Sequence, residues 1–239
     1  MRAALRAAPA LAAAVLLALP AGAVAKGRCG AHPWCDTSLP AARRAALLVQ
    51  ALTPAERIGL LGGDSADGVL GHADTHTGAA DGVPRLGVPP LHLTDGPVGV
   101  RQGSSTAFPA SIALAASFDR ALARTYGAAV ADEAKLKGND VVYAPTVNIL
   151  RTPLWGRAFE SFGEDPFLTA RLGVDWIRGA QAQGVIANVK HFAVNNQEGA
   201  QPGGGAIVGS RFTVDAKVDE RTLREIYLPQ FEAAVKEAK

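Results

Sequence analysis

The sequence lacks an apolar run long enough to be a plain membrane anchor. Its N-terminal run, residues 11–19 (LAAAVLLAL), is well short of the roughly 20 residues that a spanning helix needs. Arg2 and Arg6 precede this run, and a small-residue cleavage site, residues 23–25 (AVA), follows it. The pattern predicts a signal peptide over residues 1–25, with export to the periplasm or secretion and no membrane association after cleavage.

Cysteine is scarce, since Cys29 and Cys35 are the only two and both lie just after the expected cleavage site. A metal site would need two further ligands at a suitable spacing, and the sequence offers none, so no metal is expected. In an exported protein such a pair is typical of a small local disulfide loop. Cys29 does not directly follow a lipobox, which favours free export over a lipid anchor.

The sequence also lacks an excess of charge. Removing residues 1–25 takes away two arginines and no acidic residue, so 22 Lys and Arg remain against 22 Asp and Glu. Without a basic stripe to neutralise phosphates, nucleic acid is not an expected partner. Gly203–Gly205 does not follow a strand with the dinucleotide fingerprint, so it is interpreted as a flexible loop and not as a phosphate cradle. No organic cofactor is expected.

Apolar periodicity and turn signals divide the rest of the chain into a lead-in, residues 26–52, and one domain, residues 53–239. The composition, 48% hydrophobic and 6% aromatic, is that of an ordinary globular chain with one sizeable core. The elements expected along the chain are a helix over 41–52, a loop over 62–83, a strand over 91–93, a helix over 117–137, a strand over 141–144, a helix from 166, a strand over 185–189 and a helical region from 220.

Polar residues mark where several helices begin. Thr53 and Glu56 are arranged close to a capping box around Pro54. Asp165 and Asp219 are expected to cap later helices, and Pro229 is expected to kink or restart the last helical region. The helix over 117–137 is expected to have one apolar face, formed by Leu122, Tyr126, Ala129 and Val130.

Short apolar strands separated by amphipathic helices predict an α/β fold with a parallel sheet. In such folds the chemistry lies at the carboxyl ends of the strands. Polar residues follow all three expected strands: Asp95, the segment 148–157, and Lys190-His191. This coincidence predicts an enzyme. Only about three βα units are visible against the eight of a closed barrel, and the sequence stops inside an expected helix, so we expect a domain truncated at its C-terminus.

Each of these segments also has an interpretation without function. Asp95 begins an Asp-Gly-Pro turn, although a carboxylate at a strand end can also accept hydrogen bonds from ligand hydroxyls. Arg157 with Glu160 forms either a loop-stabilising ion pair or a ligand contact, and the structural role is favoured for Glu160. A histidine such as that of Lys190-His191 is often structural, but the polar run 195–198 that follows would be costly to bury without function.

Four segments of the sequence together resemble the N-terminal domain of glycoside hydrolase family 3. They occur in the family's order and cover roughly residues 50–239. The segments are LTDGPVGVR (93–101), APTVNILRTPLWGRAFESFGEDP (144–166), KHFAVNNQE (190–198) and VDERTLREIYLPQFE (218–232). The resemblance implies an incomplete (β/α)8 TIM-barrel-like domain, which in relatives precedes an α/β sandwich.

The resemblance also implies a pocket for the non-reducing terminal sugar. Carried over by position, the substrate-binding residues are Asp95, Arg101, Arg157, Lys190, His191 and Arg211. The Gly-rich stretch 199–210 lengthens the gap before Arg211, whereas the spacing from Arg211 through Phe231 is the familiar one. Relatives that act on N-acetylglucosaminides carry a KHFPGHG-type strand end, so KHFAVNNQE places the sequence in the glucosidase branch.

Family members hydrolyse glycosides with retention, which needs two carboxyl groups roughly 5–5.5 Å apart. The nucleophile of relatives lies in a Ser-Asp-Trp-like segment, and none occurs after Tyr227. We therefore assign neither the nucleophile nor the acid/base to this chain. The expected activity is that of an exported β-glucosidase, which binds an oligosaccharide or glycoside and of which this chain holds an inactive part. A β-xylosidase or other exo-glycosidase of the family, and a non-catalytic or vestigial sugar-binding protein, remain alternatives.

Overall fold

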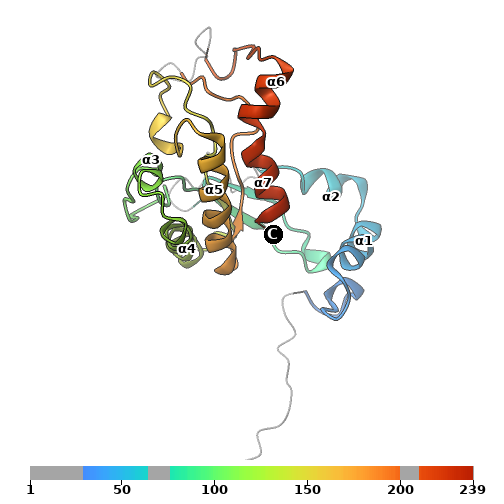
Figure 1. Ribbon diagram of the computed structural model, residues 1–239. Coiled ribbons are helices and arrows are strands. Elements are labelled where there is room, and N and C mark those ends of the chain that lie inside the picture. The colour runs from blue at the N-terminus through green and yellow to red at the C-terminus, as the bar shows by residue number, and fades with distance from the viewer. Residues whose placement is uncertain (1–28, 64–75, 200–209, 239) are drawn as a thin grey trace, which may run out of the picture.

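The computed structural model describes residues 29–63, 76–199 and 210–238. Its centre is a four-stranded sheet in the order β1-β2-β3-β4, formed by Gly78–Ala80, Leu91–Asp95, Val141–Tyr143 and Ile186–Ala187. Strands β2, β3 and β4 are parallel, and helices connect them (Figure 1). The expected α/β fold with a parallel sheet and about three βα units is therefore confirmed for these residues.

Strand β1 corrects the expectation of an uninterrupted loop over 62–83. It pairs antiparallel with β2, and Gly78 lies opposite Leu93. A Cβ atom at Gly78 would lie 2.3 Å from the Gly63 carbonyl oxygen. Only glycine therefore fits at residue 78, where the backbones of Gly63 and Gly78 approach each other. The composition of the segment is typical of a loop, but its backbone groups are paired by the edge of β2.

The helices begin close to the predicted residues. Thr53 forms a complete capping box with Glu56, and Asp165 and Asp219 cap their helices as expected. The helix expected from residue 117 begins at Arg120, because the Asp119 carboxylate accepts hydrogen bonds from the first-turn amides. The helical elements are α1 Ala41–Ala51, α2 Pro54–Gly59, α3 Ser111–Ala115, α4 Arg120–Leu136, α5 Pro166–Ala182, α6 Glu220–Thr222 and α7 Pro229–Glu237, with a π-helical segment, η4 Leu223–Tyr227, between the last two.

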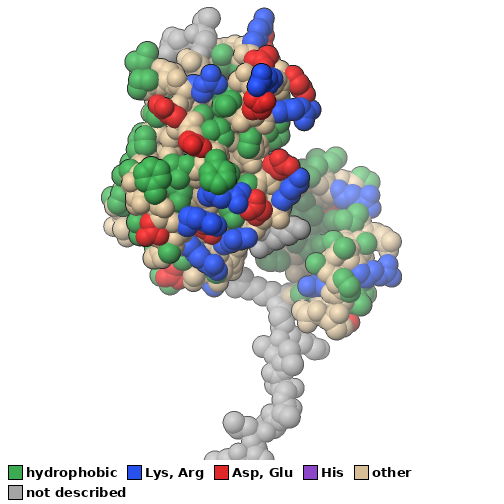
Figure 2. All heavy atoms as spheres, viewed as in Figure 1, with side chains coloured by type: hydrophobic (Ala, Val, Ile, Leu, Met, Phe, Trp, Pro, Cys, Tyr) green, Lys and Arg blue, Asp and Glu red, His purple; other side chains and the backbone are tan. Residues whose placement is uncertain are grey.

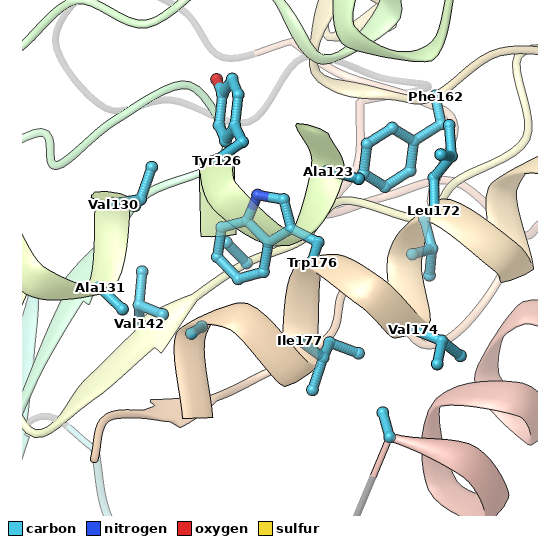
Figure 3. Close-up of a cluster of buried hydrophobic side chains, with 14 of the residues drawn as sticks. Ala123, Tyr126, Val130, Ala131, Val142, Phe162, Leu172, Val174, Trp176 and Ile177 are labelled. Carbon is cyan, nitrogen blue, oxygen red and sulfur yellow. The ribbon is translucent and has the colours of Figure 1, made fainter. Parts of the chain in front are cut away.

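Helix α5 lies between α4 and α7 (Figure 1). Glycine allows α4 and α5 to approach closely, because a Cβ at Gly127 would lie 2.1 Å from the Trp176 carbonyl oxygen and one at Gly179 would lie 1.9 Å from the Arg124 carbonyl oxygen. The Trp176 side chain, 1% exposed, points from α5 toward Tyr126 of α4 (Figure 3). Both side chains belong to the buried cluster that also contains Val142 of β3, so the two helices and the sheet share one core.

The buried face of α4 differs from the predicted one by part of a turn. Tyr126 and Val130 are buried as expected, but Leu122 is 45% exposed and Ala129 is exposed. The buried stripe instead includes the small residues Ala123, Gly127, Ala131 and Ala134, of which Gly127 lies against the backbone of α5. The outer surface of α6 and α7 carries charged side chains of both signs next to one another (Figure 2).

The N-terminal part of the described chain forms a second, smaller cluster beside the sheet. The structure joins Cys29 and Cys35 in the predicted disulfide. Trp34, between them, is buried and donates from Nε1 to the Leu86 carbonyl oxygen at 3.2 Å. The predicted signal peptide, residues 1–25, and the glycine run 203–205 lie outside the described residues. Within the described ranges, no helix is both long enough and apolar enough to cross a bilayer.

Candidate functional site

A cavity of about 630 Å³ lies at the carboxyl ends of β2, β3 and β4. Asp95 is the last residue of β2, and Lys190 follows β4, where a bridge pairs it with Thr146 beyond β3. The cavity brings together all six predicted residues, which are Asp95, Arg101, Arg157, Lys190, His191 and Arg211. The geometry shows that these side chains share one site, and their role in binding sugar stays a prediction.

Asp95 is a buried carboxylate between two cations. The Lys190 ammonium contacts its Oδ1, and Arg101 Nη1 donates to its Oδ2 at 2.8 Å. Burial by itself would raise the pKa of Asp95, but the charges of Lys190, Arg101 and Arg157 outweigh it and hold that pKa below 3.8. Asp95 is therefore ionised at neutral pH and presents fixed acceptor oxygens to the cavity.

Arg157 forms a hydrogen-bonded ion pair with the buried carboxylate of Glu160. Its Nη2 and Nε lie 2.5 and 3.1 Å from Glu160 Oε2, and the Thr146 hydroxyl donates to the same oxygen at 3.3 Å. Glu160 is 1% exposed. The ion pair between Arg157 and Glu160 is therefore present, and both residues line the cavity, so the structural role favoured for Glu160 stays a prediction. Burial lowers the pKa of Arg157, but the hydrogen bonds and charge of Glu160 more than compensate and raise it.

His191 is a neutral imidazole with a defined tautomer. Its Nδ1 lies 2.8 Å from Asn148 Oδ1, which can only accept, so Nδ1 carries the hydrogen. Arg157 Nη1 donates to the other nitrogen, Nε2, at 2.7 Å. Burial, together with the nearby charges of Arg157 and Lys190, lowers the pKa of His191 to about 3. His191 therefore stays uncharged through the range in which a free histidine titrates.

Residues that sequence reasoning did not assign complete the wall of the cavity. Glu198 lies between two arginines, 3.6 Å from Arg157 Nη1 and 3.4 Å from Arg211 Nη1. Its Oε1 is buried and, within the described ranges, has no hydrogen-bond partner. Glu198 is the last residue of the polar run 195–198, so the polarity of that run could have indicated from the sequence that Glu198 belongs to the site. Other unassigned lining residues are Thr77, Tyr143, Gly156, Phe159 and Gly199.

The arrangement is suited to a neutral, hydroxyl-rich ligand. Ionised carboxylates supply acceptors for hydroxyl hydrogens, and Lys190 and the arginines supply donors for hydroxyl oxygens. The positive charges are largely balanced inside the wall, because Asp95, Glu160 and Glu198 each contact at least one of them. Among the described residues, no group of three or more His, Cys, Asp or Glu side chains is placed to hold a metal ion.

The chain is similar to known β-glucosidases. It is 44% identical over 198 residues to a β-glucosidase of Rhizobium radiobacter, which covers 80% of this chain and 22% of the relative. It is 49% identical over 161 residues to β-glucosidase B of Emericella nidulans, with 65% of this chain and 18% of the relative covered. The chain thus spans about a fifth of the length of these curated relatives.

The fold is similar to that of solved β-glucosidases as well. The structure of β-glucosidase 3B from Thermotoga neapolitana in complex with glucose superposes with a TM-score of 0.71 at 38% sequence identity, covering 80% of this chain and 27% of that one. Residues 70–239 match the Glycosyl hydrolase family 3 N terminal domain. By this match and these relatives, the chain belongs to glycoside hydrolase family 3.

Proposed function

We propose that the cavity binds the non-reducing terminal glucosyl unit of a β-glucoside, and that the protein serves the hydrolysis of β-glucosidic bonds with retention. The observation that carries the proposal is Asp95, a buried carboxylate kept ionised by Lys190 and Arg101 at the end of β2. Such a carboxylate can accept hydrogen bonds from two adjacent sugar hydroxyls. The Lys190 ammonium and the arginines that line the cavity supply donors for the hydroxyl oxygens of the same sugar.

The proposal extends to export and to the fold around the sheet. The signal peptide expected over residues 1–25 would deliver the protein to the periplasm or the medium. The parallel strands β2, β3 and β4 would form part of a (β/α)8 barrel, which places the cavity at the carboxyl ends of its strands. The family relationship supports this arrangement.

The proposal assigns the bond-breaking carboxylates to none of these residues. Asp95, Glu160 and Glu198 line the cavity, and each is paired with a cation. A second candidate function is binding of the sugar without catalysis by this chain, because no Ser-Asp-Trp-like segment follows Tyr227 and the chain spans about a fifth of the length of the matched β-glucosidases.

Calorimetric titration of glucose into the purified chain tests the proposal. We expect binding that is lost in Asp95→Asn and retained in Asp132→Asn, which changes an exposed carboxylate on α4 in the same way. Xylose and N-acetylglucosamine in parallel titrations distinguish the glucosidase interpretation from its alternatives. If the folded chain binds none of these sugars, the proposal is wrong.

Release of nitrophenol from nitrophenyl β-glucoside separates the two candidate functions. Binding of glucose without release supports a sugar-binding role for this chain. Release that disappears in Asp95→Asn and persists in Asp132→Asn shows that the chain cleaves the bond itself, and that a bond-breaking carboxylate lies among its residues.

A further inference from the structure

The Thr77 side chain enters the cavity from outside the parallel part of the sheet. Thr77 immediately precedes β1 and lines the cavity together with Asp95. Its backbone amide donates to the Leu93 carbonyl oxygen at 2.7 Å, so the residue is fixed to the edge of β2. The position of the Thr77 hydroxyl is therefore set by the sheet.

The hydrogen bonds of the Thr77 hydroxyl determine where its hydrogen can point. The Asp95 amide donates to Thr77 Oγ1 at 2.9 Å, and Gln102 Nε2 donates to the same oxygen at 2.5 Å. A hydroxyl oxygen has two lone pairs and one hydrogen, so both lone pairs are occupied. Of the described residues, none accepts the hydrogen, which leaves the cavity as its direction.

Gln102 is held in the orientation that this pattern requires. The Thr94 hydroxyl donates to Gln102 Oε1 at 2.5 Å, and Thr94 is fully buried. The backbone carbonyl of Gln102 accepts hydrogen bonds from Lys137 Nζ at 3.2 Å and from Ser105 Oγ at 3.0 Å. With Oε1 used by Thr94, the amide group presents Nε2 to Thr77. The side chain of Gln102 thus makes the Thr77 oxygen an acceptor and frees its hydrogen for a ligand.

We propose that Thr77 is a ligand-contacting residue that donates one hydrogen bond to an oxygen of the sugar bound at Asp95. Gln102 is the positioning residue that orients the Thr77 hydroxyl. The inference rests on the proposed function, because it needs a sugar in this cavity. It adds a specificity determinant outside the motifs of the parallel strands, since a donor fixed at one point distinguishes sugars that have an acceptor oxygen there from those that lack it.

Titration of glucose and its monodeoxy derivatives into wild type and Thr77→Val tests the donor role. A neutral hydrogen bond contributes about 1 kcal/mol, so we expect Thr77→Val to weaken glucose binding by about 5- to 10-fold. For one monodeoxyglucose, the derivative without the accepting oxygen, wild type and Thr77→Val should bind equally. Thr77→Ser should restore most of the lost affinity, and Thr125→Val, an exposed change of the same kind on α4, serves as the control.

Gln102→Glu provides a second test that keeps Thr77 in place. The isosteric carboxylate can only accept, so it draws the Thr77 hydrogen away from the cavity. We expect glucose binding to weaken, with the loss again absent for the same monodeoxyglucose. Circular dichroism of each variant verifies that it is folded, and if Thr77→Val does not fold, Gln102→Glu and Thr77→Ser decide the question.

Three results would overturn the inference, and they can be told apart. If Thr77→Val binds glucose as tightly as the wild type, the Thr77 hydroxyl makes no ligand contact. If Thr77→Val does not fold, the same conclusion follows from unchanged glucose affinity in Gln102→Glu. An equal loss for glucose and for every monodeoxyglucose shows that the residue acts only through the backbone of Asp95. Absence of sugar binding by the wild type refutes the proposed function itself, and the inference with it.

Discussion

Acidification should destabilise the folded chain through His191. Its pKa is about 3 in the folded protein, whereas an unfolded histidine titrates near 6.5. Between these values the unfolded state binds one more proton than the folded state, so the free energy of unfolding falls as the pH falls. The slope is about 1.4 kcal/mol per pH unit well inside the window. Between pH 7 and pH 5 the contribution of His191 is about 2 kcal/mol.

The physical cause lies in the contacts of the imidazole ring. Protonation would place a hydrogen on Nε2, where Arg157 Nη1 already donates at 2.7 Å, and would bring a third positive charge beside Arg157 and Lys190. The predicted loss depends little on the folded pKa, because pH 5 lies well above it. His191 carries a loss of this size only if it stays neutral in the folded state.

Urea denaturation followed by tryptophan fluorescence, at several values between pH 7 and pH 5, measures the effect. His191→Gln removes the titrating group, and contributions from the other histidines and the carboxylates are common to both proteins. The wild type should therefore lose about 2 kcal/mol more than the variant over this range. Equal pH dependence in the two proteins, or a gain of stability by the wild type on acidification, would refute the reasoning.

Three further results follow from the geometry. Asp95→Asn removes the carboxylate from Lys190, whose side chain is 12% exposed, and should cost on the order of 3–5 kcal/mol of unfolding free energy, measured by urea denaturation. A loss below about 1 kcal/mol would show that the Lys190 charge does not depend on this partner. Gly179→Ala forces a Cβ against α4 and should cost about 3 kcal/mol or more in the same assay. Gly59→Ala, whose Cβ would meet no described atom within 4 Å beyond the adjacent residues and the backbone of its own helix, should be neutral or stabilise slightly, and equal effects of the two changes would contradict the close helix contact. Glucose affinity should not follow a titration near pH 6.5, since His191 is neutral in the folded state; a calorimetric transition there that is absent in His191→Gln would contradict this assignment.

Sequence reasoning located the site because the carboxyl ends of parallel strands meet at one edge of a sheet. Asp95 and Lys190-His191 are far apart in the chain, yet each follows a recognisable apolar strand, and the structure brings them into contact. Arg157 lies late in the long polar segment that follows the second expected strand, whereas Arg211 has no such landmark and only the family resemblance selected it. Their side chains reach the cavity through ion pairs with Glu160 and Glu198.

Thr77 could not be found in this way. It precedes an antiparallel edge strand whose Gly-Ala-Ala sequence has neither alternation nor β-branched residues, so no local pattern marks it as a strand. The pairing arises from the free edge of β2, a tertiary cause. The buried face of α4 was misplaced for a related reason, because Gly127 lies at the close contact with α5 while the larger Leu122 faces outward.

The charges of the cavity wall explain how it can hold several ions and still suit a neutral ligand. Asp95 contacts Lys190 and Arg101, and Arg157 contacts Glu160 and Glu198, so each buried charge already has a partner of opposite sign. Separating such pairs to bind a charged ligand would leave a buried charge uncompensated, at a cost of several kcal/mol. A sugar hydroxyl can add a hydrogen bond to a paired carboxylate without breaking the pair. Selectivity among neutral ligands then depends on where the uncharged groups point, which is why the direction of the Thr77 hydroxyl matters more than further charge.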